Sequence, residues 1–545
     1  MPKEQPLVED PPVERRIGTR SSGESIGESL TNHMSESPNG TLHEKLLDAL
    51  AEGDPQEVAS LISAGADVRY QDEHGYDALI HAVHGRDVLG DPRLIELMTL
   101  LIRSGVPLTG RSTYSESGVR VLSRLGRFDA VQVLLQAGAD PGDLEMTPLI
   151  GAAAFGSLTD VEDAVRSGAD LEGRDFWERT PWLVAVQAGD VPKASLLLER
   201  GADRNARGRC GKPPLFYAIE NGHPLMLRWL LENGADVRAT DDFGSTALAA
   251  AAEEGDADAV DVLLRAGADA NQTFASGSAL GSARTREAAL RLLEAGADPQ
   301  ELSFGGRRAI LGYAPDPDEE LLRVSAEEFR AFRSRRFGRR NPEAMNNPFW
   351  EGMIRAGVNA YRAAVRVEGE RRLGARHGPI WCAERFGQSL TLLGDGRIVQ
   401  VGGEHEDGYD PDFCIYNDVF VHAPGGVTIY GYPEAVFPPT DFHTATLIGG
   451  HVYLIGSLGY QGTRRFGETP VYRLDARTFR MERLVTTGDG PGWIYKHRGV
   501  LLGPHEIQVT GGKVATDVGG VEVHSDNRST FILNAETLAW SLNDP

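Results

Sequence analysis

The tripeptide Gly-Ala-Asp recurs through the first 300 residues of this 545-residue chain and constrains its fold more than any other feature. A degenerate copy, Gly105-Val106-Pro107, lies in the long gap after the first. Full copies begin at Gly65, Gly138, Gly168, Gly201, Gly234, Gly267 and Gly296. When the degenerate copy at Gly105 is included, the seven intervals between successive copies run from 29 to 40 residues, and four of them are 33. A period of about 33 residues predicts a stack of helical repeats, each burying its apolar face against the next.

The clearest unit, residues 179–201, shows how one repeat is built. Thr180 is a residue type that caps helices, and Pro181 suits a first helical turn because no amide donor is needed there. Gly189 ends the first helix, and Gly201 ends the second in a left-handed conformation that glycine adopts readily. The unit therefore predicts a helix–turn–helix closed by a turn.

These units resemble the ankyrin repeat family over residues 42–302, which predicts about eight of them. Three units depart from the pattern. The second carries an insertion from Arg86 to Leu94, and the third has polar Ser115 and Glu116 where a helix should start. The last, residues 277–296, is truncated. The resemblance implies an all-α ankyrin solenoid that binds another macromolecule, and it implies no chemistry.

In the ankyrin family, the hairpin tips before each helix pair point into a concave groove. The candidate partner-binding residues at these tips are Tyr76, Phe176, Trp177, Arg179, Arg209, Lys212 and Phe243. Aromatic and arginine side chains are frequent anchors of protein interfaces. For Phe176 and Trp177 the alternative is that the rings fold back and cover a gap between units.

Composition bounds the class of protein. Residues 1–41 are rich in Pro, Glu, Ser and Gly, so we expect a disordered tail. A net charge of −24 works against broad nucleic-acid binding. There is no run of about 18 apolar residues to span a membrane. Three widely spaced cysteines favour a reducing compartment. We expect a cytoplasmic protein with protein partners and no nucleic acid or membrane partner.

Residues 303–379 are predicted to form a helical connector. A helix is expected to open at Asp318 or Ser325 and to include the basic run Phe329–Arg340. These arginines either contact RNA or an anionic surface, or lie on a helix docked against the acidic repeats. A second helix, residues 349–364, is expected to cover a sheet edge of the domain that follows.

After Trp381 the pattern turns to short strands rich in Val, Ile and Tyr, and it repeats. Strands end at Gly402, Gly456 and Gly511, at intervals of 54 and 55 residues. This pattern is similar to the kelch repeat, which implies an all-β partial propeller of three four-stranded units over residues 380–545. The partial propeller either has covered edges or closes by pairing with a second chain, as a homodimer.

One polar loop suggests ligand binding. The candidate residues are His405, Glu406, Asp407, Asp410, Asp412, Asp441 and His443. Their oxygen and imidazole atoms suit a divalent ion, but the spacing matches no zinc or calcium motif. We therefore expect no metal, no cofactor and no catalytic residue.

The sequence predicts a scaffold protein without catalysis. The ankyrin groove would bind one macromolecular partner, and the kelch-like domain a second partner or ligand. Two alternatives stay open. One is an enzyme or sensor whose kelch-like loops hold a metal or small molecule. The other is a bacterial toxin-neutralising or effector protein, which rests on analogy of fold alone.

Overall fold

The computed structural model describes residues 38–84, 88–275, 277–302, 304–313, 323–368, 379–407 and 410–543. Within these, the side chains of residues 38–41, 300, 304, 305, 368, 406, 407 and 410–412 lie outside the description. The chain divides into two compact units, Met1–Ala235 and Asp236–Pro545. Residues 1–37 of the predicted tail lie outside the described residues, and the first helix begins at Pro38.

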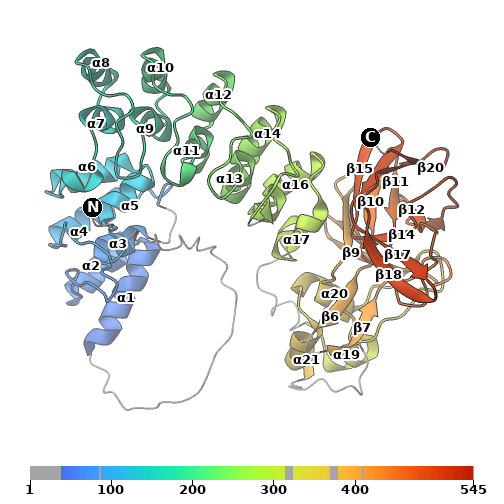
Figure 1. Ribbon diagram of the computed structural model, residues 1–545. Helices are drawn as coiled ribbons and strands as arrows, with labels where there is room; N and C mark the ends of the chain where they lie inside the picture. Colours follow the sequence, from blue (N-terminus) through green and yellow to red (C-terminus); the bar gives the residue numbers. More distant parts are fainter. Residues whose placement is uncertain are drawn as a thin grey trace, which may run out of the picture. The chain divides into compact units, whose positions relative to one another are not determined.

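Helices follow one another in pairs through the first unit (Figure 1). They are α1 (Pro38–Glu52), α2 (Pro55–Ser63), α3 (Ala78–Val83), α4 (Leu94–Arg103), α5 (Gly118–Arg124), α6 (Phe128–Gln136), α7 (Pro148–Phe155), α8 (Leu158–Arg166), α9 (Pro181–Gln187), α10 (Val191–Glu199), α11 (Pro214–Glu220) and α12 (Pro224–Glu232). Helix α3 packs on α1 and α5, and α9 packs on α7 and α11. The first helix of each pair thus contacts its counterparts in neighbouring pairs, as a helical solenoid requires.

The helix ends follow the predicted chemistry. Thr180 Oγ1 accepts a hydrogen bond from the Leu183 amide at 3.3 Å, and Pro181 occupies the first turn of α9. Gly201, after α10, has φ +96°, the left-handed conformation predicted for it. The third unit differs from expectation. Helix α5 has a capped start, because Ser117 accepts from the Arg120 amide at 3.4 Å.

Trp177, in the tip before α9, and Gln187, the last residue of α9, both donate to backbone carbonyls of α5. Trp177 Nε1 donates to the carbonyl of Arg120 at 2.9 Å, and Gln187 Nε2 donates to the carbonyl of Arg124 at 2.8 Å. Carbonyls in the last turn of a helix have no partner within the helix. Gln187 therefore satisfies the carbonyl of the last residue of α5, and Trp177 ties its tip to the third residue of the same helix.

In the second unit, helix pairs continue before the chain turns to strands (Figure 1). The helices are α13 (Ala247–Glu254), α14 (Ala257–Arg265), α15 (Ala279–Ser282), α16 (Arg286–Glu294), α17 (Phe304–Leu311), α19 (Ala326–Phe332), α20 (Pro348–Ala356) and α21 (Ala360–Glu368), with the 3-10 turn η3 (Pro299–Glu301) and the hairpin β1 (Thr273–Phe274) and β2 (Gly277–Ser278). Helix α15 has four residues, consistent with a truncated last unit.

The basic run is not one helix, and this prediction was wrong. Helix α19 begins after a capping box at Ser325 and ends at Phe332. The chain then runs beside residues 380 and 381, and the Arg333 carbonyl accepts from the Trp381 amide at 2.6 Å. Arg335 Nη1 donates to the hydroxyl of Tyr460 at 3.1 Å. Pairing with the β-rich region thus ends the helix early.

The C-terminal region is all β and contains several antiparallel sheets (Figure 1). In the order of pairing, the first of the three larger sheets contains β3 (Glu343–Ala344), β9 (Gly426–Gly431), β8 (Val419–Ala423), β5 (Ile398–Val401) and β4 (Ser389–Leu392). The second contains β10 (Thr444–Ile448), β11 (His451–Ile455), β12 (Val471–Asp475) and β13 (Met481–Arg483). The third contains β15 (Arg498–Gly503), β16 (Glu506–Thr510), β19 (Phe531–Asn534) and β20 (Ala539–Leu542). Smaller sheets are β6 (Glu404–Asp407) with β7 (Asp410–Ile415), and β14 (Trp493–Tyr495) with β17 (Lys513–Val518) and β18 (Val521–Asp526).

The outer edge of the first sheet is covered by a strand, not by the predicted helix 349–364. Strand β3 pairs with β9, which joins Glu343 to Gly431. The predicted helix is two helices, α20 and α21, with Gly357 at φ +58° between them. Trp350 of α20 stacks on Trp381 at 4.6 Å in the same buried core as β8 and β9 residues. The helix therefore supplies core packing and leaves the edge to the connector strand.

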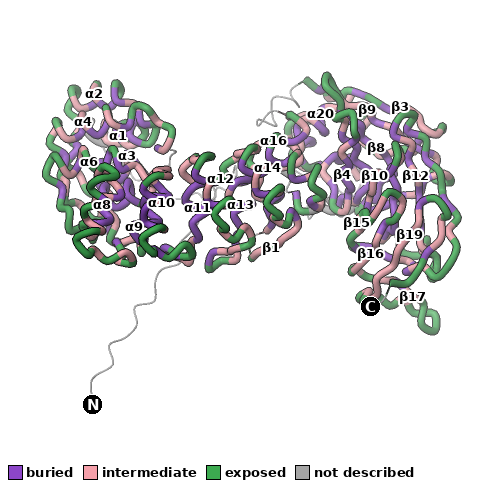
Figure 2. Tube along the Cα trace, turned by 90° about the horizontal axis from the view of Figure 1, so that it is seen from above, coloured by how far each residue is buried: buried purple, intermediate pink, exposed green. Residues whose placement is uncertain are grey.

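The three larger sheets meet through one strand of each, because β10 of the second sheet lies beside both β4 of the first and β15 of the third. Two hydrogen bonds of the same kind cross these contacts. His443 Nε2 bonds the hydroxyl of Ser389 at 2.8 Å, and His497 Nε2 bonds the hydroxyl of Thr444 at 2.9 Å. All four side chains are buried. Figure 2 colours the chain by burial, and buried segments run through the strands of this region. Each imidazole directly precedes the first residue of a strand, β10 or β15, and bonds the first residue of the neighbouring strand, β4 or β10.

Candidate partner-binding surface

An aspartate organises several repeat tips in the same way. In each case Oδ1 accepts the backbone amides two and four residues further on, at 2.7–3.0 Å. The aspartates are Asp72, Asp175 and Asp241. Such turns hold the intervening backbone in one shape. These aspartates were not among the predicted residues, although they recur at one position of the repeat and the sequence therefore carries a signal for them.

Phe176 and Trp177 form the aromatic part of the candidate surface. Their rings meet edge to face at 5.0 Å and both remain partly exposed. The guanidinium of Arg120 lies 3.6 Å from the centre of the Phe176 ring. Arg209 lies 4.8 Å from the same ring and 5.1 Å from that of Trp177. Stacked cations and the bond from Trp177 Nε1 hold both rings in place.

Arg179 does not belong to this surface, because only 1% of it is exposed. Its Nε donates to Asp175 Oδ2 at 2.9 Å, and its Nη1 donates to the Ser123 carbonyl at 2.6 Å. Further bonds join it to the Ser123 hydroxyl at 2.7 Å and to Gln187. Arg179 therefore ties its own tip to α5 and has no donor left to face a partner.

The remaining predicted tip residues contact other side chains or belong to the second unit. Tyr76 is partly buried, with its ring 5.7 Å from His81. Lys212 Nζ is bound to both oxygens of Glu220, at 2.9 and 2.7 Å. Phe243 is 50% exposed and lies in the second unit. Of the seven predicted residues, the structure brings together Phe176, Trp177 and Arg209.

Three of the seven predicted ligand-loop residues have described side chains, and all three are buried. His443 and Asp441 are fully buried and His405 is 7% exposed. Asp441 Oδ1 accepts the Gly459 amide at 2.6 Å, and burial raises the pKa of this carboxyl. Glu406, Asp407, Asp410 and Asp412 have side chains outside the described part. Where side chains are described, no three His, Cys, Asp or Glu residues gather closely enough to hold a metal ion.

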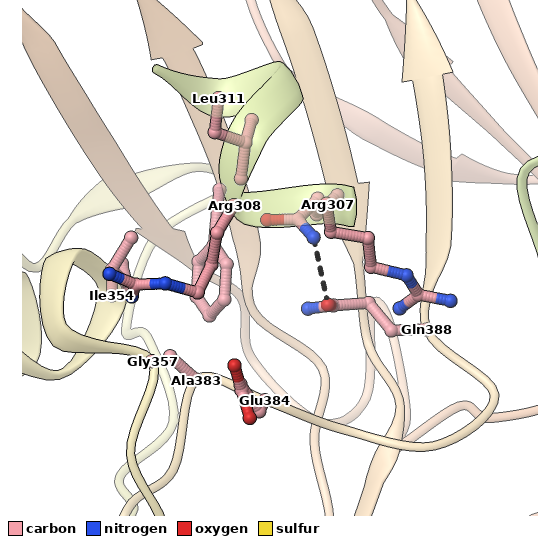
Figure 3. A pocket seen from close by; sticks show the side chains of 10 residues that line it. Arg307, Arg308, Leu311, Ile354, Gly357, Ala383, Glu384 and Gln388 are labelled. Atoms are coloured by element: carbon pink, nitrogen blue, oxygen red, sulfur yellow. Dashed lines mark hydrogen bonds between the residues drawn. The ribbon is translucent and has the colours of Figure 1, made fainter. Parts of the chain in front are cut away.

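A small cavity lies between α17, α20 and the first sheet (Figure 3). Arg307 and Arg308 line one side, and Glu384 and Gln388 line the other. Burial raises the pKa of Glu384 to about 7 despite the two arginines. The cavity measures about 30 Å³, which is room for water molecules and too small for most substrates.

Comparison with known proteins bears on the helical part of the chain. The family model for ankyrin repeats matches three times, over residues 149–241, 183–274 and 215–302. A search of the curated proteins returned no match. Among solved structures, the chain is similar to the ankyrin repeat domain of Bcl-3, a member of the IkappaB protein family. The two share 25% identity over 46% of this chain and 97% of that one, with a TM-score of 0.22.

These comparisons do not identify the β-rich region. The prediction of kelch repeats there stays a prediction. Within the described residues, no helix is long and apolar enough to cross a membrane. The family match and the successive helix pairs agree over one part of the chain: residues 149–302 are ankyrin repeats.

Proposed function

We propose that this protein binds a protein partner through the ankyrin tips around Phe176 and Trp177 and works as a scaffold without catalysis. Ankyrin repeats generally serve protein–protein interaction, which supports the class of function. The observation that carries the proposal is the cluster of Phe176, Trp177 and Arg209, two partly exposed rings with the guanidinium of an exposed arginine about 5 Å from both ring centres. Partly exposed aromatic rings with arginine are typical of interface anchors.

Rigidity strengthens this choice of surface. Asp175 fixes the backbone of the tip, and Trp177 Nε1 is anchored on the Arg120 carbonyl. A side chain already held in its binding conformation loses little entropy when a partner arrives. The predicted alternative, that the rings cover a gap between units, accounts for their anchoring and not for their remaining exposure.

Affinity capture with three forms of the full chain tests the proposal. We expect the Phe176→Ala/Trp177→Ala variant to recover at least tenfold less of the partner than the natural chain, because truncating interface anchors costs about 2 kcal/mol or more each. The matched control is Leu225→Ala/Arg228→Ala on α12, where Leu225 is 74% exposed. Equal recovery by the tip variant and the control would exclude the tips as the binding surface. Thermal unfolding of each variant checks that it is folded.

For the β-rich region we propose a partial propeller that pairs with a second copy of the chain. Three successive meanders, β4-β5-β8-β9 (with β3 added at its edge), β10-β11-β12-β13 and β15-β16-β19-β20, support this arrangement, and β10 contacts both β4 and β15. The open side of β4 is occupied by η3 from the same chain. At the other end, β15 carries Leu501 and Leu502, which are 45% and 50% exposed. Strand β15 begins with exposed Arg498 where β4 and β10 begin with buried Ser389 and Thr444.

Sedimentation equilibrium over a range of concentrations tests this pairing. We expect the natural chain to dimerise and the Leu501→Glu/Leu502→Glu variant to be monomeric, because buried carboxylates in the interface would lack partners. Leu542→Glu on β20, where Leu542 is 55% exposed, is the control and should dimerise. A natural chain that stays monomeric at 100 µM (on the order of a weak interface's dissociation constant) would contradict the proposal.

A further inference from the structure

The tip that follows the aromatic pair is unusually basic for this chain. Residues 205–213 contain Arg207, Arg209 and Lys212 and no acidic residue, in a protein of net charge −24. The tip lies directly beside the rings, because the Arg209 amide donates to the carbonyl of Trp177 at 3.0 Å. A local basic surface in an acidic protein attracts an acidic partner.

Arg209 differs from the other cations around the cluster in what it contacts. Arg124 lies 3.5 Å from a Glu116 oxygen, Arg111 pairs with Asp143, and Lys212 pairs with Glu220. For Arg209, which is exposed, the described residues include no carboxylate within ion-pair distance. Its contacts are the faces of the two aromatic rings.

This arrangement prepares one kind of hydrogen bonding. A guanidinium held beside aromatic rings by cation–π attraction makes no hydrogen bond to them, so its N–H donors stay available to another partner. Those donors match the two oxygens of a carboxylate in a bidentate pair. The rings hold the guanidinium in place beforehand, which lowers the entropy cost of forming that pair.

We propose that Arg209 binds a carboxylate of an acidic peptide segment in the partner, and that the segment lies across Phe176 and Trp177. The inference rests on the proposed function, since it names the partner chemistry of the same surface. An aspartate or glutamate meets Arg209, and a neighbouring apolar side chain packs on the exposed parts of the rings. Arg207 adds a second positive charge on the same tip.

The experiment selects binders from a random dodecamer peptide library displayed on phage, using the full chain as bait. Parallel selections use Arg209→Glu, the control Arg228→Glu on α12, and Phe176→Ala/Trp177→Ala. We expect the natural chain and the control to enrich peptides containing Asp or Glu next to an apolar residue. The Arg209→Glu variant should enrich Lys or Arg at that place instead. An enriched peptide is then synthesised and titrated by fluorescence anisotropy, and Arg209→Glu should weaken it by at least about tenfold.

The outcomes separate this inference from the proposed function. Peptides that depend on Phe176 and Trp177 but lack acidic residues, or bind Arg209→Glu equally well, would overturn the carboxylate assignment and leave the surface in place. Peptides enriched equally by the double alanine variant, or no enrichment by any bait, would overturn both. The enriched peptide is also synthesised with phosphoserine in place of its acidic residue and titrated in the same way. If it binds more than about tenfold tighter than the carboxylate version, a phosphoryl group replaces the carboxylate as the ligand.

Arg209 is exposed, its side chain lies against the two aromatic rings, and its two backbone hydrogen bonds do not depend on the side chain. Arg209→Glu should therefore unfold at the same temperature as the natural chain. Arg209→Lys provides a second readout. A lysine keeps the charge and loses the planar fork, so it should bind the acidic peptide more weakly than arginine and more tightly than glutamate. Binding by Arg209→Lys equal to that of the natural chain would contradict a bidentate pair.

Discussion

Replacing Arg179 with alanine is expected to lower the free energy of unfolding by about 3–5 kcal/mol. The change removes a buried cation and leaves Asp175, itself a buried residue, as an uncompensated charge. The Ser123 carbonyl, which accepts from Arg179 at 2.6 Å, also loses its side-chain donor. Buried ionised groups without a partner are among the most destabilising features of a protein.

Urea unfolding followed by circular dichroism measures this effect. Arg174→Ala is the matched control, because Arg174 is exposed on the same tip and bonds only carbonyls, at 2.6 and 2.7 Å. We expect the control to change stability by less than about 1 kcal/mol. A loss below about 1 kcal/mol for Arg179→Ala itself would mean that the tip does not depend on this arginine.

Acid is expected to destabilise the β-rich region through the two imidazoles between its sheets. Burial lowers the pKa of both His443 and His497 to about 3. For His497, repulsion from His443 acts in the same direction as burial. The unfolded chain has histidine pKa values near about 6.5, so between that pH and about 3 it binds more protons than the folded chain. Stability therefore falls as pH decreases through this window, by about 1.4 kcal/mol per pH unit for each histidine.

Other groups titrate in the same range, so the test compares slopes between variants. Burial also lowers the pKa of His422 to about 3, which acts in the same direction. The raised pKa of Glu384, about 7, acts in the opposite direction, because the folded chain holds its proton up to a higher pH. The variant is His443→Gln/His497→Gln, since Gln388 stands at the corresponding place before β4. We expect its unfolding free energy to depend less on pH between 6.5 and 5, by up to about 2.7 kcal/mol per unit. Parallel slopes for the two proteins would show that these imidazoles do not titrate on unfolding.

Much of the helical architecture could be predicted because its signals are local. The interval between Gly-Ala-Asp copies reports the length of a repeat, and Thr180 and Pro181 report a helix start whatever surrounds them. The spacing of Gly402, Gly456 and Gly511 likewise corresponds to three successive sheets. The finer prediction of a kelch propeller goes beyond what the comparisons support.

What could not be predicted depends on partners far away in the sequence. Arg179 was assigned to an exposed tip, as an arginine in a turn normally is, yet it is buried because Ser123 and Gln187 meet it there. His443 was assigned to a ligand loop and instead bonds Ser389 between two sheets. The connector helix after Ser325 ends early because its next residues pair with residues near Trp381. Local patterns carry no information about any of these contacts.

Isothermal titration of the captured partner into the purified full chain is the most direct test of the central claim. If the tips around Phe176 and Trp177 are the binding surface, the Phe176→Ala/Trp177→Ala variant binds at least about 30-fold more weakly, which corresponds to roughly 2 kcal/mol. The Leu225→Ala/Arg228→Ala control binds like the natural chain. A dissociation constant for the tip variant within about twofold of the natural value would contradict the account.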